Sequence, residues 1–240
     1  MLKRAKVSGF IDYRLSEIEE YVDLGKNSYR RSKKDNEKEV FNNEETETIL
    51  SYLVNNIDKH NLGILLMFVK GLRVGEVATL KNENIVDNYI IVENSETRYK
   101  TSDGIVYEVG FTKTTRSERS VVLPEGCEWI CSLLRELNPN GEFVFVNSKG
   151  RMTTNCFRGR LRTICKNLGF IQKSPHKIRK TYSSIIKDAG VGDILIKSQM
   201  GHTNIKTTEE NYYRDRIKKD KKSQVLGNVK DFDIVKKRCI

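Results

Sequence analysis

The sequence predicts a mostly α-helical domain that carries one small three-stranded antiparallel sheet, an α+β fold class. Apolar residues recur at helical spacing over most of the chain, whereas three β-branched runs cluster between residues 88 and 123. Hydrophobic residues make up 38% of the 240 residues, which is too much for a wholly disordered protein. We therefore expect folded structure nearly throughout.

The start of the chain is predicted to be a separate, short region. Residues 10–24 suit a single helix, and residues 25–39 (GKNSYRRSKKDNEKE) form a charged run that is typical of a linker. A lone helix cannot bury a core of its own. The chain is therefore divided into residues 1–40, a main domain over residues 41–228 and a C-terminal tail over residues 229–240.

Two helices are expected at the start of the main domain. Asn43 can cap the first, because an acidic first turn follows it and apolar residues then recur at helical spacing from Ile49 to Ile57. The stretch from Leu62 to Val69 is nearly all apolar, which predicts a buried helix.

The three β-branched runs are YIIVE (89–93), IVYEVGFT (105–112) and RSVVL (119–123). We expect them to pair in one antiparallel sheet, which Pro124 closes. Helix-like segments follow near residues 126–137, 153–168, 175–189, 191–199 and 204–213.

Positive charge is distributed unevenly along the chain. The net charge is +11, and residues 111–180 hold 14 Lys and Arg against 5 Asp and Glu, while residues 214–240 hold 10 against 4. Clustered positive charge favours a polyanion, because binding releases counterions from its phosphate backbone. A basic surface that only aids solubility is the alternative.

Cysteine usage and hydropathy argue against several protein classes. The five cysteines contain no CxxC pair, so they are interpreted as reduced thiols, and Cys127 and Cys131 are expected to pack in the core. No apolar run approaches the roughly 18 residues that span a bilayer, and the N-terminus lacks the apolar stretch of a signal peptide. We expect a cytoplasmic protein without a membrane partner.

Candidate anion-binding residues occur at two places before residue 120. Arg73 follows the second helix directly, and it needs an anionic partner, either a bound anion or the carboxylate of Glu76. Lys113 lies between the second and third β-branched runs, where a hairpin tip can project its side chain into a groove. A lysine that only protects a strand edge is the alternative.

The segment SPHKIRKTYSS predicts a helix start that can bind an anion. Ser174 can cap the helix and Pro175 suits its first position, so His176 and Arg179 share one face of the first turn. Free N–H groups and the helix dipole also favour phosphate at this end. A capped helix with ordinary surface charge is the alternative.

Five motifs in order, GLRVGE, TKTTRSERSVVLP, HKIRKT, MGH and TEENYYR, resemble those of the tyrosine recombinases. The resemblance is strongest to integrases of phages and conjugative elements. It covers about residues 40–228 and implies the catalytic-domain fold of that family. The catalytic residues that it implies are Arg73, Lys113, His176, Arg179, His202 and Tyr212.

The position of the nucleophile depends on a spacing. Tyr212 lies ten residues after His202, the spacing of integrases related to conjugative transposons, and Tyr213 is the alternative. Lys180 stands where the family often has histidine, and it keeps a hydrogen-bond donor.

The resemblance also implies a mechanism without a metal or cofactor. Arg73 and Arg179 would clamp the non-bridging oxygens of a DNA phosphate while Tyr212 attacks the phosphorus. Lys113 would protonate the departing 5′ oxygen, and His176 would act as a base or hydrogen-bond partner. His202 would hold a phosphate oxygen.

The implied partner is double-stranded DNA, bound by a homotetramer that an excisionase or a host DNA-bending protein can assist. The segment around Val225 to Phe232 would contact a neighbouring protomer. Residues expected to contact DNA directly are Arg116, Arg158, Arg160, Arg162, Lys177 and Lys180.

Family members usually carry a helical core-binding domain before the catalytic one, and residues 1–40 are too few to supply it. A shortened gene product, a fragment and a minimal recombinase all fit this departure. Three other functions stay open: an inactive DNA-binding remnant or accessory protein, a type IB topoisomerase, and a resolver of chromosome dimers.

Overall fold

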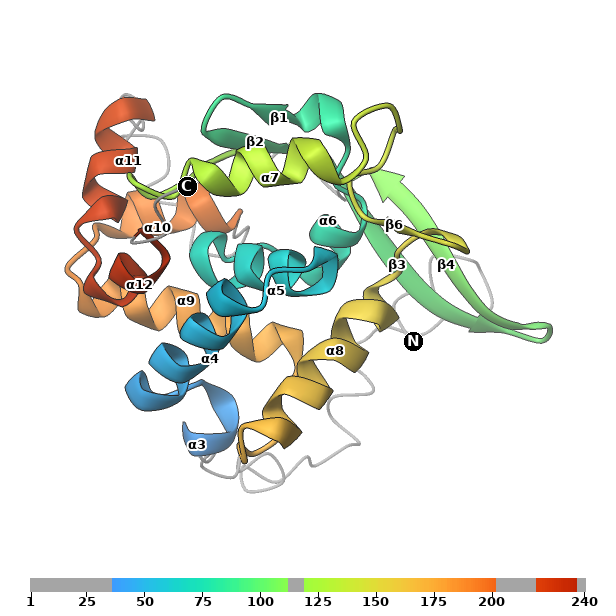
Figure 1. Cartoon of the computed structure of the whole chain (residues 1–240), viewed down its shortest axis with the longest axis horizontal. Helices are drawn as coiled ribbons and strands as arrows, with labels where there is room; N and C mark the ends of the chain where they lie inside the picture. The colour runs from blue at the N-terminus through green and yellow to red at the C-terminus, as the bar shows by residue number, and fades with distance from the viewer. Residues whose placement is uncertain (1–35, 112–118, 202–218, 237–240) are drawn as a thin grey trace, which may run out of the picture. The chain divides into compact units, whose positions relative to one another are not determined.

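The computed structural model describes residues 36–111, 119–201 and 219–236. This part of the chain is mostly helical and carries small antiparallel sheets, as predicted (Figure 1). Its helices are α3 (Asn36–Glu39), α4 (Asn43–Asn55), α5 (Lys59–Lys70), α6 (Val74–Ala78), η1 (Asn82–Asn84), α7 (Trp129–Leu137), α8 (Thr154–Asn167), α9 (Pro175–Asp188), α10 (Asp193–Met200), α11 (Lys219–Gly227), η2 (Lys230–Phe232) and α12 (Asp233–Lys236). Its strands are β1 (Ile85–Val86), β2 (Tyr89–Val92), β3 (Asn94–Thr101), β4 (Gly104–Phe111), β5 (Arg119–Val122), β6 (Val146–Asn147) and β7 (Gly150–Arg151).

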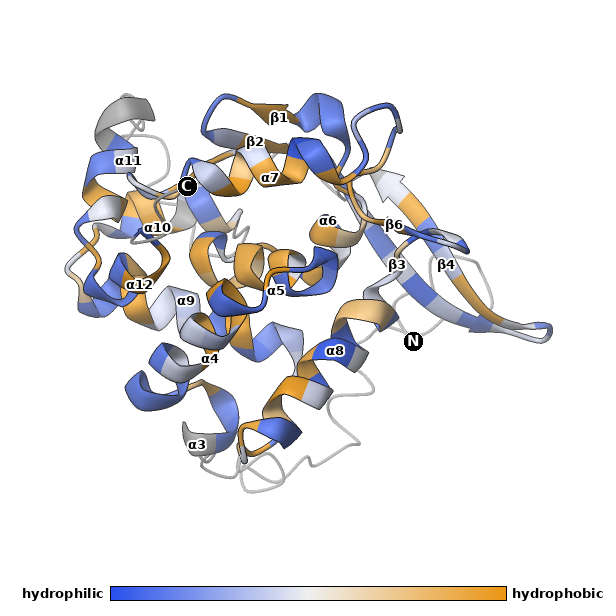
Figure 2. Cartoon of the chain, viewed as in Figure 1, coloured by the Kyte–Doolittle hydropathy of each residue, from blue (hydrophilic) through white to orange (hydrophobic). Residues whose placement is uncertain are grey.

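Helix α5 forms the centre of the core. It begins at the cap Asp58, whose side chain accepts two backbone hydrogen bonds, and it ends at Gly71, which takes a left-handed φ of 63°. Every residue from Asn61 to Lys70 is buried, and the helix packs against α4, α8 and α9. Figure 2 shows its hydrophobic colour among these elements. The chain therefore leaves the core at Gly71, two residues before Arg73.

Helix α4 begins one residue earlier than the sequence predicted. The cap is Asn42 and not Asn43: Asn42 Oδ1 accepts a hydrogen bond from Glu45 N at 2.8 Å, and Glu45 Oε2 accepts one from Asn42 N at 3.0 Å. This reciprocal pair satisfies two backbone donors at once, which favours Asn42 over its neighbour.

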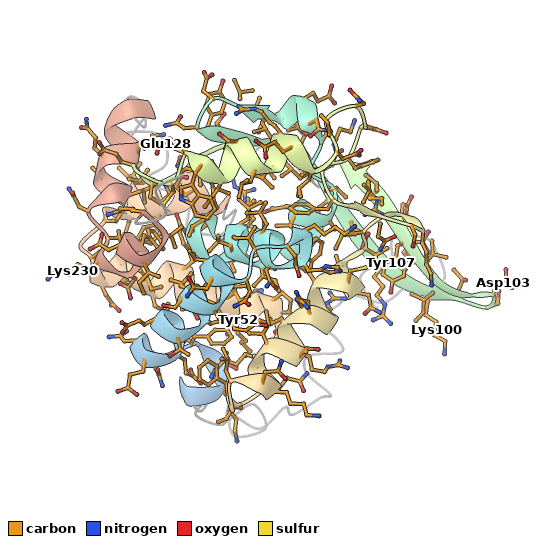
Figure 3. The ribbon with its side chains drawn as sticks, viewed as in Figure 1. Tyr52, Lys100, Asp103, Tyr107, Glu128 and Lys230 are labelled. Atoms are coloured by element: carbon orange, nitrogen blue, oxygen red, sulfur yellow. The ribbon has the colours of Figure 1, made fainter. Side chains whose placement is uncertain are left out.

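The structure contains a three-stranded antiparallel sheet, but only two of its strands come from the three predicted runs. β2 and β5, from the first and third runs, pair antiparallel, and β1 occupies the other edge of β2. The run at 105–112 instead contributes β4, which pairs with β3 in a separate hairpin through the turn after Thr101. β3 (NSETRYKT) is almost entirely polar, so β-branched patterning could not reveal it. The hairpin extends away from the helices, with Lys100 and Asp103 at its far end (Figures 1 and 3).

The C-terminal segment packs on the same core. Val229, Phe232 and Val235 are each at most 1% exposed, and η2 and α12 contact α4. Trp129 Nε1 donates a hydrogen bond to Val235 O at 2.9 Å, and the Phe232 ring stacks on Tyr182. In the described structure residues 229–236 therefore pack on the core of the main domain, and contact of this segment with a neighbouring protomer stays a prediction.

Two expectations from composition can be compared with the structure. Cys127 and Cys131 are buried in the core, which confirms the packing predicted for them. Among the helices that the structure describes, none combines the length and the apolarity needed to cross a bilayer.

Candidate active site

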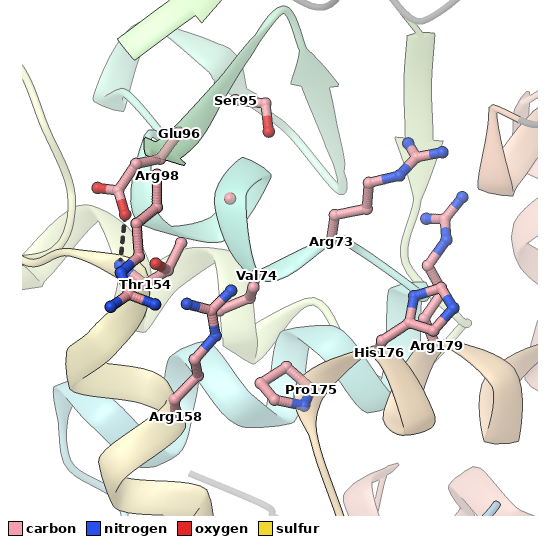
Figure 4. A pocket seen from close by; sticks show the side chains of 11 residues that line it. Arg73, Val74, Ser95, Glu96, Arg98, Thr154, Arg158, Pro175, His176 and Arg179 are labelled. Carbon is pink, nitrogen blue, oxygen red and sulfur yellow. Dashed lines mark hydrogen bonds between the residues drawn. The ribbon is translucent and has the colours of Figure 1, made fainter. Parts of the chain in front are cut away.

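A cleft of about 270 Å³ lies where the start of α6, strand β3 and the first turns of α8 and α9 meet (Figure 4). Its charged lining is strongly positive, because four arginines face one glutamate. These residues are Arg73, Arg98, Arg158, Arg179 and Glu96, with the imidazole of His176 beside them. A site of this charge favours an anion.

Arg73 reaches the cleft from the turn that follows α5. Its Nη1 donates a hydrogen bond to Glu76 Oε1 at 2.8 Å, and its backbone N–H donates to Glu76 Oε2 at 2.8 Å. The ion pair considered from the sequence is therefore present. The Arg73 side chain is nevertheless 41% exposed and lines the cleft, so the guanidinium is held by the pair and stays accessible.

The same Glu76 carboxylate binds a second arginine. Arg119 Nη1 and Nη2 donate to Glu76 Oε1 and Oε2 at 3.1 and 2.9 Å, and the side chains of this pair are 6% and 2% exposed. Burial alone would raise the pKa of Glu76, but the hydrogen bonds and charge of Arg119, with the charge of Arg179, hold that pKa below its usual value. Glu76 is therefore an anion that fixes two guanidinium groups.

Arg179 and His176 enter the cleft from the first turn of α9. Pro175 occupies the first helical position as predicted, whereas the side chain of Ser174 at the cap makes no hydrogen bond to the helix. The guanidinium of Arg179, 2% exposed as a residue, donates to Gly71 O and to Met200 O. Burial, and then the charge of Arg73, lowers the pKa of Arg179 to about 9.

The imidazole of His176 lies in a cationic environment. Burial lowers its pKa first, and the charges of Lys180 and Arg179 lower it further. A neutral imidazole at pH 7 can accept a proton or a hydrogen bond.

The end of α10 is fastened to the two buried arginines. Arg119 Nε donates to Gln199 O at 2.8 Å, while Arg179 donates to Met200 O. Gly201 takes a left-handed φ of 60°, and a Cβ there would lie 3.0 Å from Arg119 Nη1. The chain therefore passes tightly over Arg119 immediately before His202.

The structure brings together three of the predicted catalytic residues, Arg73, His176 and Arg179, from two elements far apart in the sequence. The other predicted catalytic residues, Lys113, His202 and Tyr212, lie outside the described residues, as do Arg116 and the alternative Tyr213.

The residues expected to contact DNA have different surroundings. Arg158 lines the cleft and Arg162 is exposed, whereas Arg160 pairs with Asp58 and with Asn61 Oδ1. Lys177 and Lys180 both pair with one carboxylate of α3. Hydrogen bonds from these two lysines hold the pKa of that carboxylate, Glu39, at about 2. Both lysines would have to leave this pair to reach DNA.

Three further residues of the site were not found from the sequence. Arg98 and Glu96 lie on the polar strand β3, which carried no strand signal. In the sequence, Arg119 is recognisable only as the first residue of the β-branched run at 119–123. An arginine at the start of a buried strand needs an internal anion, and this rule could have identified it.

Comparisons with known proteins agree with this architecture. Residues 39–219 match the sequence profile of the Phage integrase family. The chain is 23% identical over 171 residues to tyrosine recombinase XerA of Thermococcus kodakarensis and 26% identical over 179 residues to tyrosine recombinase XerC of Staphylococcus saprophyticus. These alignments cover 69% and 70% of this chain, and the chain spans about half of the relatives, 55% and 54%.

A solved structure has the same fold. The Tn1549 transposon integrase in complex with circular intermediate DNA gives a TM-score of 0.60 at 21% identity. The match covers 85% of this chain and 68% of that chain.

Proposed function

Because this chain belongs to the Phage integrase family, we propose that it is a site-specific DNA recombinase. It cleaves and rejoins strands through a 3′-phosphotyrosyl intermediate and serves the integration or excision of a mobile element. The observation that carries this proposal is the convergence of Arg73, Arg179 and His176 in one cationic cleft. The relatives named tyrosine recombinases and the DNA in the Tn1549 complex support the choice of DNA as substrate.

In the proposed reaction the phosphate of one DNA strand enters this cleft. Arg73 and Arg179 stabilise the charge that develops on its non-bridging oxygens. The Tyr212 hydroxyl attacks phosphorus and passes its proton to His176, while Lys113 gives a proton to the departing 5′ oxygen. His202 donates a hydrogen bond to a phosphate oxygen. The new bond joins tyrosine to the 3′ phosphate.

The second half of the reaction reverses the first with another strand. A free 5′-hydroxyl attacks the phosphotyrosine, and the tyrosine leaves with its proton restored. One phosphate ester is exchanged for another in each step, so the reaction needs no external energy source. Four protomers that act in pairs exchange both strands of two duplexes, with double-stranded DNA as the partner.

The test is covalent trapping. A pool of nicked duplexes with random sequence around the nick is incubated with the protein. Covalent protein–DNA adducts, which stay joined when boiled in detergent, are isolated, digested with protease to release the DNA, and sequenced. We expect adducts with the unmodified protein and with Tyr213→Phe, and none with Tyr212→Phe. The reverse pattern would move the nucleophile to Tyr213.

A full-length tyrosine recombinase on its own site serves as the positive control. If that enzyme forms adducts and this chain forms none, the chain is a DNA-binding protein without strand-exchange activity. The sequences selected by trapping are then used as sites to distinguish recombination from DNA relaxation. Rapid relaxation of supercoiled plasmid without recombinants between two sites would support topoisomerase activity instead.

A further inference from the structure

The base of the β3–β4 hairpin is fastened to the start of α8 by Glu96. Its Oε1 accepts a hydrogen bond from Thr154 N at 2.8 Å, which Figure 4 draws as a dashed line. Its Oε2 accepts one from Arg151 Nη1 at 2.5 Å. The Glu96 side chain is 0% exposed, so its charge is compensated within the protein. Strand and helix are therefore fixed together at this point.

Arg98 lies one structural repeat beyond Glu96 on strand β3, and Arg158 lies about one turn beyond Thr154 on helix α8. Residues two apart in a strand share a face, as do residues four apart in a helix. Arg98 lies two residues after Glu96, and Arg158 lies four residues after Thr154. Both side chains consequently line the cleft, on the side away from Arg73, His176 and Arg179 (Figure 4).

Neither Arg98 nor Arg158 is compensated by the protein in the part of the chain that the structure describes. The carboxylates near them are committed elsewhere: Glu96 binds Arg151, and Glu76 binds Arg73 and Arg119. Thr154 Oγ1, which also lines the cleft and belongs to a residue 3% exposed, has no hydrogen-bond partner among the described residues. Four guanidinium groups around one cleft repel one another, and a bound anion relieves this repulsion.

We infer that Arg98 and Arg158 form a second phosphate subsite in the cleft, with Thr154 Oγ1 as a further hydrogen-bonding group. The ligand is a backbone phosphate of DNA that neighbours the phosphate held by Arg73 and Arg179, so the inference rests on the proposed function. Successive phosphates of a strand are spaced by about 3.4 Å along the helix axis, and guanidinium forks bind phosphate in a bidentate manner. The subsite would position the strand for cleavage at its neighbour.

The first test measures the salt dependence of DNA binding. Arg98→Gln/Arg158→Gln is compared with Lys187→Gln/Lys230→Gln, which removes equal charge from exposed positions. Lys187 lies eleven residues along α9 from His176, about 16 Å from it at 1.5 Å per residue. Lys230 lies on the opposite side of the view from Lys100 of the hairpin (Figure 3). The probe is a short fluorescent duplex of mixed sequence.

Losing one phosphate contact lowers the slope of log K against log salt by about 0.9. We expect this fall in the double arginine variant, little change in the lysine variant, and recovery in Arg98→Lys/Arg158→Lys. Thermal unfolding of all variants verifies that they fold. The inference would be contradicted if the double arginine variant had the same slope as the unmodified protein, or if the lysine variant showed an equal fall in slope.

The second test locates the phosphate. On a duplex selected by trapping, each phosphate beside the cleaved one is replaced in turn by a neutral methylphosphonate. We expect one replacement to slow adduct formation by the unmodified protein and to have no further effect on the double arginine variant. Equal slowing in both proteins would contradict the inference. If the unmodified protein forms no adduct but the salt slope still falls, the proposed function fails and the phosphate subsite stands.

Discussion

The Glu76 carboxylate accepts four hydrogen bonds from Arg73 and Arg119, which lie on different elements. The Arg119 pair is buried, whereas Arg73 remains partly exposed and is screened by solvent. One residue thus holds an accessible guanidinium on one side and a buried one on the other. The loss of stability on removing Glu76 should therefore come mainly from its buried pair with Arg119.

Replacing Glu76 by alanine is expected to destabilise the fold strongly. The change removes the buried carboxylate that compensates the charge of Arg119, which costs about 3 to 5 kcal/mol. The matched change is Glu83→Ala, which removes a carboxylate 69% exposed in its surface pair with Lys81. That change should cost less than about 1 kcal/mol. Urea unfolding at pH 7 measures both, and similar midpoints would contradict the role of Glu76.

Lys70 is a second buried charge, outside the cleft. Its Nζ donates to Val121 O at 2.6 Å, and the residue is 0% exposed. Burial lowers its pKa from 10.5 to about 7, and the neighbouring thiols of Cys131 and Cys127 oppose that shift weakly. The unfolded chain therefore binds more protons than the folded chain between about pH 7 and pH 10.5.

This difference predicts a pH dependence of stability with a definite sign. The Lys70 contribution to the unfolding free energy should rise with pH from about 7 to 10.5, by at most about 1.4 kcal/mol per pH unit. Below pH 7 both states are charged and the contribution is constant. Lys70→Met should remove this pH dependence. The difference in unfolding free energy between the unmodified protein and the variant therefore separates the Lys70 contribution from that of the titrating thiols. A difference that does not change with pH would refute the shifted pKa.

At the scale of elements, Gly71 determines how α5 delivers the chain to the cleft. Its φ is 63°, and a Cβ there would lie 2.3 Å from Tyr182 Cδ1. Gly190, after α9, has a similar φ of 75° with nothing within 4 Å of such a Cβ. The two glycines share a left-handed backbone conformation, and they differ in what a Cβ at each position would contact.

Gly190→Ala should cost about 1 to 2 kcal/mol, the penalty of a left-handed residue that has a Cβ. Gly71→Ala should cost more by about 1 to 3 kcal/mol, because the buried Tyr182 ring has to move. Thermal or urea unfolding of the pair separates steric from backbone effects. Equal losses of stability in the two variants would show that the Tyr182 ring can move without a free-energy penalty.

The elements that the sequence could predict are those with an apolar face. Helices α4, α5, α7, α8, α9 and α10 and strands β2 and β5 have such faces, and they were found within a few residues, whereas the short helix α6 was not predicted. Strand β3 has almost none, because its hydrogen bonds to β4 replace burial as the source of order. A β-branched run therefore identified β4 but not its partner.

The same limit applied to the cleft. Arg73, His176 and Arg179 stand in motifs that resemble those of the tyrosine recombinases, and that resemblance, rather than a local pattern, implied that they converge. Arg98 has no such signal, and its place depends on the Glu96 contact to Thr154 across 58 residues. Pairing between distant residues of this kind is not encoded in local pattern.

At the scale of the whole molecule, the C-terminal segment closes the core. Phe232 is 0% exposed and stacks on Tyr182, which in turn packs on Gly71. Trp129, the single tryptophan of the chain, donates to Val235 O from the other side. The last described residues are thus connected to the turn that precedes Arg73.

Phe232→Ala is expected to cost about 3 to 5 kcal/mol, since it removes a fully buried ring. The exposed neighbour Lys230 provides the control, and Lys230→Ala should change stability by less than about 0.5 kcal/mol. Trp129 fluorescence follows urea unfolding of both proteins. If Phe232→Ala unfolds at the same urea concentration as the control, the segment does not contribute to the core in solution.

Arg179 joins two chain segments that are far apart, through Gly71 O and Met200 O. Functional groups are commonly strained, so that replacing them makes an enzyme more robust and less active. In this protein the Arg179 guanidinium also links two chain segments, and its removal takes a hydrogen bond from the carbonyl of Gly71 and from that of Met200. Under the proposed function, replacing Arg179 is therefore expected to lower both the activity and the stability of the protein, so the usual gain in stability on loss of activity does not apply at this position.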